Sequence, residues 1–211
     1  MTPFITLTAV AVPLDMVNVD TDRIVPARFL RKPRSAGYEN FLFHDLREKD
    51  PQFVLDRPAF KDAQILVAAE NFGCGSSREG AVWALAGAGF RAWIAPSFGD
   101  IFFENSFKNG VLAIVLPLDT VARLRGALAA RPGTKLTIDL AAQAVTMPGG
   151  EVESFDIDPF RKECLLAGID EIQLTLRYED AIAAYERRQR DETPWLSPGA
   201  SCGKAPDQPA G

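Results

Sequence analysis

Residues 71–79 have types and spacing suited to binding a small anion, and they read Asn-Phe-Gly-Cys-Gly-Ser-Ser-Arg-Glu. Gly73 and Gly75 let the backbone turn sharply and approach a ligand closely. The segment lies between an apolar run and a helix-forming stretch, and the free N–H groups and dipole of a helix start favour an anion. Arg78 adds a planar guanidinium that can hold a carboxylate through two hydrogen bonds. Together these features predict a carboxylate or phosphate site.

The same residues also fit an ordinary capped helix. Serine is a preferred N-cap residue, and Ser76 with Glu79 three positions later forms the pattern of a capping box. That interpretation does not explain why two glycines, Cys74 and Arg78 surround the cap. The residue types alone leave both interpretations open.

Two polar pairs elsewhere are weaker candidates for a pocket. Asp20 and Asp22 lie in a polar turn, where an Asx-turn accounts for them without a ligand. Lys108 and Asn109 follow a predicted helix and precede a glycine, so a helix C-terminus accounts for them equally well. A structural role is the simpler expectation for both pairs.

His44 and Cys74 are also expected to be structural. His44 is the only histidine and lies in irregular sequence between aromatic and aliphatic residues. Cys74 is expected to fill a small buried space, because a thiol that binds a metal needs companion ligands nearby.

The elements around residues 71–79 alternate between strand and helix, which predicts an α/β layer. Continuous apolar runs are typical of strands buried on both faces. The sequence predicts strands at 4–12, 65–69, 92–95, 111–116, 135–140 and 144–147, and helices at 27–30, 77–88, 100–109, 118–130, 158–167 and 180–190. Because strand-like sequence opens the chain and returns at 135–157, we expect one sheet built from both ends of the domain.

Length and composition predict one folded domain with a short extension. The chain has 211 residues, of which 47% are hydrophobic and 24% charged, as in ordinary globular proteins. Residues 189–211 hold four prolines and three glycines and little apolar surface. We therefore expect a domain at 1–188 and a disordered tail at 189–211.

Charge and hydropathy argue against several classes of partner. The net charge is −5 and the basic residues are scattered, so neither nucleic acid nor a membrane surface is expected as a partner. The longest aliphatic run, at 111–116, is far shorter than the roughly 20 residues that span a bilayer. No basic residue precedes Arg23 and no secretory signal is recognisable, so we expect a cytoplasmic protein.

The cysteines are few and far apart. Cys74, Cys164 and Cys202 match neither a disulfide framework nor a zinc site, so reduced thiols are expected. An iron–sulfur cluster takes several thiolates, usually closely spaced. We therefore expect no cofactor in this chain, and any such cluster would come from another subunit.

Four motifs in the same order resemble the small subunits of 3-isopropylmalate dehydratases, the swivelling-domain partners in the aconitase superfamily. The first is the segment 71–79 described above. The other three are Asn18-Val-Asp-Thr-Asp-Arg-Ile-Val-Pro, Ala95-Pro-Ser-Phe-Gly-Asp-Ile-Phe-Phe-Glu-Asn-Ser-Phe-Lys-Asn-Gly, and Leu174-Thr-Leu followed by Asp180-Ala-Ile-Ala-Ala-Tyr-Glu. The resemblance covers about residues 4–188.

The resemblance implies a swivelling β/β/α domain, with a mixed sheet and flanking helices. It implies a hydro-lyase that moves a hydroxyl between neighbouring carbons of a substituted malate, for leucine biosynthesis, with a [4Fe-4S] cluster in the partner large subunit. By motif position, Ser76 is the base that removes the carbon-bound proton, and Gly75, Ser77 and Arg78 hold a substrate carboxylate. The substituent pocket is expected between Pro26 and Tyr38, where Phe29, Leu30 and Arg31 can line it, with Asp20, Asp22, Lys108 and Asn109 as further pocket residues.

The chain departs from the family pattern at four positions. Gly80 stands where histidine usually follows the Arg-Glu pair, Val82 and Ala113 replace prolines, and Gln173 replaces a glycine. Glycine within a helix also costs about 1 kcal/mol relative to alanine. Because the residues that can act on substrate are retained, we expect an active enzyme in which Gly80→His changes turnover by no more than about tenfold, or ~1.4 kcal/mol of barrier.

These departures leave two alternatives to the dehydratase of leucine biosynthesis. One is the small subunit of a related hydro-lyase that acts on another substituted malate, such as citramalate or dimethylmalate. The other is a non-catalytic binding subunit, against which the retention of Ser76 and Arg78 argues.

Overall fold

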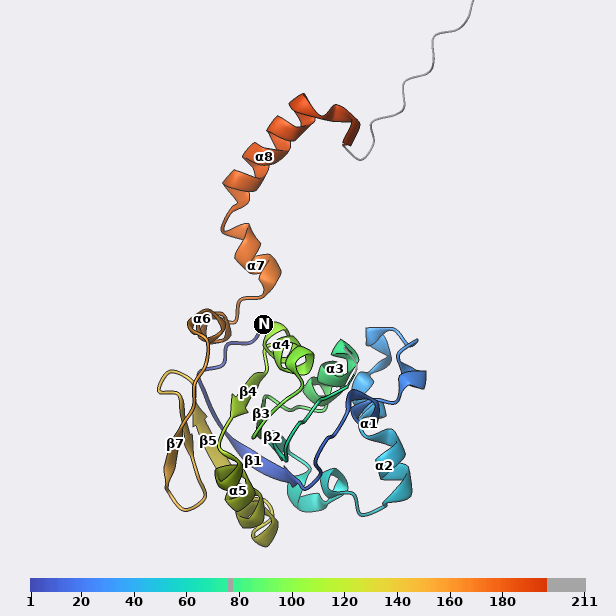
Figure 1. Ribbon diagram of the computed structural model, residues 1–211, viewed down its shortest axis with the longest axis vertical. Helices are drawn as coiled ribbons and strands as arrows, with labels where there is room; N and C mark the ends of the chain where they lie inside the picture. The colour runs from blue at the N-terminus through green and yellow to red at the C-terminus, as the bar shows by residue number, and fades with distance from the viewer. Residues whose placement is uncertain (76–77, 197–211) are drawn as a thin grey trace, which may run out of the picture. The chain divides into compact units, whose positions relative to one another are not determined.

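The computed structural model describes residues 1–75 and 78–196 (Figure 1). The chain divides into two compact units, Met1–Asp170 and Glu171–Gly211. The first unit holds the sheet and the segment 71–79. In its described part, the second unit consists of α7 (Glu171–Leu176), α8 (Glu179–Glu192) and a 3-10 turn at Pro194–Leu196.

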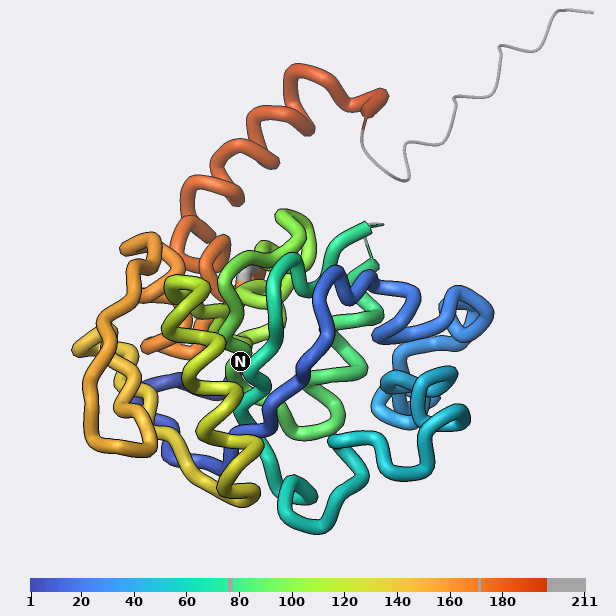
Figure 2. The backbone as a smooth tube through the Cα atoms, turned by 60° about the horizontal axis from the view of Figure 1, so that its bottom comes forward, coloured from blue at the N-terminus to red at the C-terminus, as the bar shows by residue number. Residues whose placement is uncertain are grey.

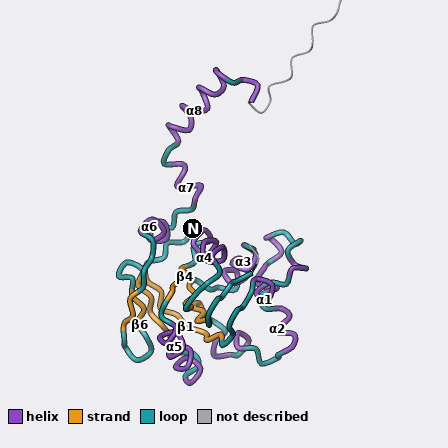
Figure 3. Tube along the Cα trace, in the orientation of Figure 1, coloured by secondary structure: helices purple, strands orange, loops and turns teal. Residues whose placement is uncertain are grey.

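A seven-stranded mixed sheet forms the core of the first unit (Figure 3), in the order β4-β3-β2-β1-β5-β6-β7. Its strands are β1 (Thr6–Leu14), β2 (Ala63–Ala68), β3 (Ala92–Ala95), β4 (Leu112–Val115), β5 (Lys135–Asp139), β6 (Ala144–Thr146) and β7 (Val152–Ser154). β1 pairs in parallel with β2 and antiparallel with β5, so the two ends of the unit meet at this strand. The predicted mixed sheet, built from both ends of the domain, is confirmed.

The strands β1 to β4 are parallel to their neighbours and joined by helices. α3 (Glu79–Gly87) connects β2 to β3, and α4 (Asp100–Lys108) connects β3 to β4. Both crossovers step in the same direction along the sheet, and right-handed crossovers of this kind place their helices on one face. β3 is buried at all four positions, which requires cover on both faces.

The other face of the parallel strands is covered by α5 (Leu118–Ala130), which packs across β1, β2 and β3 (Figure 2). Val121, Leu124 and Leu128 are buried, and their spacing places them on one side of the helix. The antiparallel strands have lighter cover. In β5 the buried Leu136 and Ile138 alternate with more exposed residues, the pattern of a sheet packed on one face only.

Short helices join β1 to β2 and follow β7. They are α1 (Thr21–Ile24), α2 (His44–Lys49) and 3-10 turns at Ala27–Phe29, Arg34–Ala36, Tyr38–Phe41, Val54–Asp56 and Pro58–Phe60. After β7, α6 (Pro159–Ala167) is capped by Asp158, whose carboxylate accepts from the backbone N–H of Arg161 at 3.0 Å. The irregular character predicted for 32–58 and the helix predicted at 158–167 are thus confirmed.

Several boundaries differ from the prediction, and those of the helices matter most for the site and the tail. The helix expected from residue 77 begins at Glu79 with Arg78 as its N-cap, because the backbone of Arg78 is still extended (φ −140°, ψ 100°). The interpretation of Ser76 as the cap of this helix is therefore wrong. α7 was not expected, and α8 continues past residue 190 to Glu192. The tail predicted to be disordered at 189–211 includes the end of α8 and the 3-10 turn at Pro194–Leu196, while residues 197–211 lie outside the described residues.

Candidate active site

Three loops meet where the parallel strands β1, β2 and β3 end. Because parallel strands end at the same edge of a sheet, the segments 15–20, 69–75 and 96–99 leave it side by side. Backbone bonds join them: the N–H of Gly73 donates to the carbonyl of Val19 at 2.7 Å, and that of Phe72 to the carbonyl of Ser97 at 3.1 Å. The middle loop, which carries the predicted site, is thus held on both sides.

Glycine is required in this middle loop by both conformation and space. Gly73 and Gly75 have φ values of +73° and +88°, a left-handed region that side chains rarely adopt. A Cβ on Gly73 would also overlap the ring of Phe102. The backbone at Gly75 lies over Asp20, whose Cβ is 3.4 Å from where a Cβ on Gly75 would stand. Sequence reasoning expected sharp turning here, and the φ values confirm it.

Arg78 and Asp22 are brought together from segments 56 positions apart. The guanidinium Nη1 of Arg78 donates to the carboxylate of Asp22 and forms an ion pair with it. The Arg78 side chain is only 19% exposed, whereas that of Asp22 is 51% exposed. A guanidinium has five N–H donors in a rigid fork, so one contact with Asp22 fixes its direction while the fork can still receive a second carboxylate.

Asp20 has a local role that the Asx-turn interpretation anticipated. Its side chain caps α1 by accepting from the backbone N–H of Arg23 at 2.7 Å. The next residue, Thr21, donates its backbone N–H to the carbonyl of Cys74 at 3.0 Å. Asp20 therefore both starts α1 and lies beside the middle loop.

A cavity of about 340 Å³ opens between the middle loop and the start of α4. It is lined by Asn71, Gly73, Cys74, Gly75, Phe98, Gly99, Asp100, Ile101 and Phe102. Cys74 is partly exposed at its wall, so the expectation that this thiol fills a small buried space is wrong. The contribution of 98–102 was not recognised from sequence, although these residues lie in one of the four motifs. Ser76 and Ser77 lie outside the described residues.

The three residues expected to line the substituent pocket lie in different surroundings. Leu30 lies against the start of α3, with its Cδ2 3.2 Å from where a Cβ on Gly80 would stand. The ring of Phe29 stacks on Phe41 with centroids 4.3 Å apart. Arg31 is exposed. Of the three, Leu30 is the one that the structure brings to the helix following the middle loop.

Asn109 links α4 to the first residue of α3. As the C-cap residue of α4, it donates its side-chain amide to the carboxylate of Glu79 at 2.9 Å and accepts from Arg34 Nη2 at 3.3 Å. Lys108 is the last residue of α4. The C-terminal cap expected here is confirmed, and Arg34 and Glu79 are supporting residues that the sequence did not reveal.

Tyr38 lies directly over Gly80. A Cβ on this glycine would stand 2.8 Å from the Cε1 atom of Tyr38, closer than real Cβ contacts allow. The tyrosine is 3% exposed, and its ring is held edge-on to Trp83 with centroids 5.3 Å apart. A side chain at position 80 would have to displace this ring, a contact that the expected small effect of Gly80→His on turnover did not take into account.

Comparison with curated proteins identifies the family. The chain is 50% identical over 201 residues to the 3-isopropylmalate dehydratase small subunit of Paramagnetospirillum magneticum, covering 93% of this chain and 100% of the relative. It is 52% identical over 200 residues to that of Rhodospirillum centenum, covering 92% and 98%. This chain belongs to the 3-isopropylmalate dehydratase small-subunit family.

Family domains and a solved structure agree with this assignment. The Aconitase C-terminal domain matches residues 1–119, LeuD_N matches 122–159, and the C-terminal domain of the 3-isopropylmalate dehydratase small subunit matches 171–199. The crystal structure of 3-isopropylmalate dehydratase (leuD) from Methanocaldococcus jannaschii superposes with a TM-score of 0.63 at 26% identity, covering 86% of this chain and 99% of that one. The predicted swivelling-domain fold of the aconitase superfamily is confirmed.

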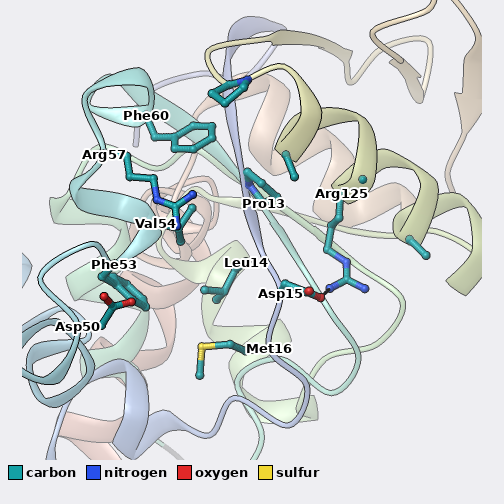
Figure 4. Close-up of a pocket in the computed structure, with 14 residues that line it drawn as sticks. Pro13, Leu14, Asp15, Met16, Asp50, Phe53, Val54, Arg57, Phe60 and Arg125 are labelled. Carbon is teal, nitrogen blue, oxygen red and sulfur yellow. Dashed lines mark hydrogen bonds and ion pairs between the residues drawn. The ribbon is translucent and has the colours of Figure 1, made fainter.

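A second cavity in this small-subunit fold has different chemistry. It measures about 460 Å³ and lies between α5 and residues 50–60 (Figure 4). Arg125 at its wall forms an ion pair with Asp15, and Arg57 Nε donates to the carbonyl of Gln52 at 3.2 Å. With Asp50 also present, two arginines and two aspartates balance one another in formal charge. None of the described residues 71–75 and 78–79 lines it, so we place the candidate active site at the middle loop.

The described ligand-type side chains do not fit an iron–sulfur cluster. In residues 1–75 and 78–196, the group of possible metal ligands that come within 4.8 Å of one another is His44, Asp45 and Glu48, which contains no thiol. Arg28 also places its guanidinium on Asp45 and 3.3 Å from His44 Nδ1, which disfavours a cation there. The ring of His44 packs against that of Phe29, with centroids 5.0 Å apart. Within the described part of the chain, no helix is long and apolar enough to cross a membrane.

Proposed function

We propose that this chain is the small subunit of 3-isopropylmalate dehydratase and helps to interconvert 2-isopropylmalate and 3-isopropylmalate by dehydration and rehydration, in leucine biosynthesis. The observation that supports this most is the Arg78 guanidinium, held by Asp22 beside the glycine loop. The whole chain supports the same conclusion, because it is 50% and 52% identical, over nearly its full length, to two 3-isopropylmalate dehydratase small subunits. The substrate is a dicarboxylate, for which a fixed guanidinium is a suitable partner.

Arg78 is assigned to hold a substrate carboxylate next to the carbon that loses its proton. In the transition state, negative charge spreads from that carbon onto the neighbouring carboxylate. A guanidinium that contacts this carboxylate therefore stabilises the transition state more than the substrate, which is the condition for catalysis. Gly75 and Ser77, on either side of Ser76 in the chain, are assigned to bind the same carboxylate.

Ser76 is assigned as the base. Its Oγ would receive the proton removed from carbon and return it in the reverse direction. A serine hydroxyl is a weak base in water, so its deprotonated form needs positive potential nearby. Arg78, two residues later, and the N-terminus of α3 both supply that sign.

The large subunit is the proposed partner, and we assign the [4Fe-4S] cluster to it. When bound, such a cluster supplies a Lewis acid for the leaving hydroxyl. The present chain then contributes the proton transfer and the carboxylate contacts, and excludes bulk water from the substrate when it closes over it. Neither nucleic acid nor a membrane enters this proposal, and the pathway is a cytoplasmic one.

The substituent of the substrate is assigned to Leu30 and its neighbours Phe29 and Arg31. Leu30 lies beside Gly80 in the first turn of α3, and Gly80 is only two residues after Arg78. An aliphatic substituent packed on Leu30 would therefore lie near the carboxylate that Arg78 binds. A methyl group, as in citramalate, would fill less of that space than an isopropyl group. The size of the substituent is therefore the property that separates the main proposal from a related hydro-lyase.

Reconstitution tests the proposal. The full chain is purified with the large subunit from the same source, and turnover is measured on 2-isopropylmalate, 3-isopropylmalate, citramalate and dimethylmalate. We expect the highest kcat/KM with the two isopropylmalates. A preference for citramalate or dimethylmalate would assign the chain to a related hydro-lyase, and binding to the large subunit without turnover of any malate would favour the non-catalytic alternative.

A further inference from the structure

Gly80 is not required by its own backbone. It lies in the first turn of α3 and its φ is outside the positive range that favours glycine. Gly126 in α5 is a helix glycine with nothing within 4 Å of an added Cβ, whereas the corresponding position on Gly80 is filled by Tyr38 and Leu30. Glycine at position 80 is thus explained by what lies above it.

The ring above Gly80 is fixed in place from several sides. The Tyr38 hydroxyl donates to the carbonyl of Lys32 at 3.0 Å. Its ring meets Phe41 and Trp83 edge-on, at centroid distances of 5.9 and 5.3 Å. Trp83 is in turn contacted by Arg34, whose guanidinium carbon lies 4.9 Å from the centroid of the indole ring. Tyr38 therefore connects the segment 29–41 rigidly to the first turn of α3.

Both parts of the proposed site depend on this connection. Arg78 immediately precedes α3, and side-chain atoms of Leu30 and Tyr38 lie 3.2 and 2.8 Å from where a Cβ on Gly80 would stand. We propose that Tyr38 is a positioning residue that, seated on Gly80, sets the distance between Leu30 and Arg78 and so determines which substituent the substrate can carry. This inference rests on the proposed function, because it assigns the substituent to Leu30 and the carboxylate to Arg78.

A purely structural role of Tyr38 and a positioning role lead to different kinetic results. If Tyr38 only stabilised the fold, its loss would lower the amount of folded enzyme and reduce activity by the same factor for every substrate. If it sets the spacing between two substrate contacts, its loss changes the preference between substrates. The ratio of kcat/KM for 2-isopropylmalate to that for citramalate, which differ only in the substituent, separates the two roles.

The experiment uses the full chain assembled with its large subunit. The variants are Tyr38→Leu, Gly80→Ala and their combination, with Tyr38→Phe as the conservative change and Gly126→Ala as the matched glycine control. We expect Tyr38→Leu and Gly80→Ala each to lower kcat/KM at least tenfold for 2-isopropylmalate and at most threefold for citramalate. Tyr38→Phe keeps the ring and Gly126→Ala adds a methyl group in open space, so both are expected to stay within threefold of wild type.

The double variant tests whether the two residues act through one contact. Because either change alone disrupts it, Tyr38→Leu with Gly80→Ala should lose no more than the more damaged single variant. Losses that multiply in the double variant, an unchanged substrate ratio, or a Gly80→Ala variant that behaves like Gly126→Ala would each overturn the inference.

A second measurement separates this inference from the proposed function. Hydrogen exchange of the peptide covering 78–86 is followed in the full chain without substrate, and it should accelerate at least tenfold in Tyr38→Leu and not in Gly126→Ala. If the wild-type complex turns over no malate, the proposed function and the assignment of substrate preference to Tyr38 both fail, and faster exchange in Tyr38→Leu then shows only that Tyr38 holds the first turn of α3. Unchanged exchange in Tyr38→Leu overturns the positioning role whatever the activity.

Discussion

β1 pairs with β2 on one side and with β5 on the other, and the strands on those two sides are buried differently. β3 is buried at every position, because helices cover both faces of the parallel strands. β5 alternates, with Leu136 and Ile138 buried and their neighbours more exposed. Parallel strands need long crossover connections, whereas β5, β6 and β7 are joined by short ones.

This difference explains where the site lies. Each parallel strand delivers a loop to the same edge of the sheet, and the helix after it is held by packing on the sheet. Arg78, Asp22 and the cavity beside Cys74 all belong to that edge. The antiparallel strands complete the core, but they bring no candidate site residue to the loop edge. We therefore expect substitutions on the two sides to affect chemistry and stability differently.

The largest effect is expected for Ser76→Ala, on the side of the parallel strands. Removing the proposed base should lower kcat by at least about a thousandfold, or ~4 kcal/mol of barrier, while the fold and the association with the large subunit are kept. Steady-state turnover of the co-purified complex measures it. Near-normal turnover would remove Ser76 from the chemistry and leave Arg78 as the main contribution of this loop.

Local patterns in the sequence were sufficient for most elements. The strand at Ala92–Ala95 and the helix at Leu118–Ala130 were predicted to the residue, because a short apolar run and a 3.6-residue period are visible within one segment. The sharp turns of the glycine loop could also be predicted from sequence, since Gly73 and Gly75 indicate positive φ angles.

Contacts between distant segments were not predictable in the same way. Arg34 and Asn109 are 75 positions apart, and nothing in either segment indicates that they pair. The start of α3 was also placed too early, because the two serines before Arg78 have a strong local preference for a cap. In the sequence, Tyr38 was only the last residue of the segment predicted to line the pocket. That its ring lies over Gly80 became apparent only from the structure.

Ile138→Ala tests the antiparallel side of the sheet. Ile138 is fully buried, and truncation of such a side chain costs about 3 kcal/mol in free energy of unfolding. Because β5 carries no candidate site residue, we expect kcat of the folded complex to stay unchanged. Urea unfolding and turnover are measured on the same preparation. The matched control is Ile65→Ala in β2, also fully buried, for which both stability and kcat should fall.

Arg78→Lys tests the charge at the parallel edge against its geometry. Lysine keeps the positive charge but loses the planar fork, so we expect kcat/KM to fall about a hundredfold, or ~2.7 kcal/mol. Arg123→Lys is the control, since Arg123 pairs with Glu153 on β7 at 3.4 Å and is largely exposed. It should leave turnover within twofold. Equal losses in both variants would mean that the planar fork is not specifically required at the loop edge.

The smallest effect concerns the pair Arg28 and Asp45, which lies on the parallel side but away from the loop edge. The hydrogen bond from Arg28 lowers the pKa of Asp45 below its ordinary value of 3.8. A carboxyl group with a lower pKa in the folded state stabilises the fold at pH values above its unfolded pKa, and this stabilisation is lost as the pH falls through the folded pKa. Both side chains are well exposed, so the contribution is small.

We therefore expect the urea midpoint of wild type to exceed that of Asp45→Asn slightly and by a constant amount from pH 7 to about pH 5. Below about pH 4 the two midpoints should converge. Arg28→Gln removes the partner and should abolish this pH-dependent difference, whereas a difference that widens on acidification would contradict the assignment. Turnover at neutral pH should be unchanged in Asp45→Asn. A clear loss would extend the functional region from the loop edge to α2 and to the ring of Phe29 that packs beside His44.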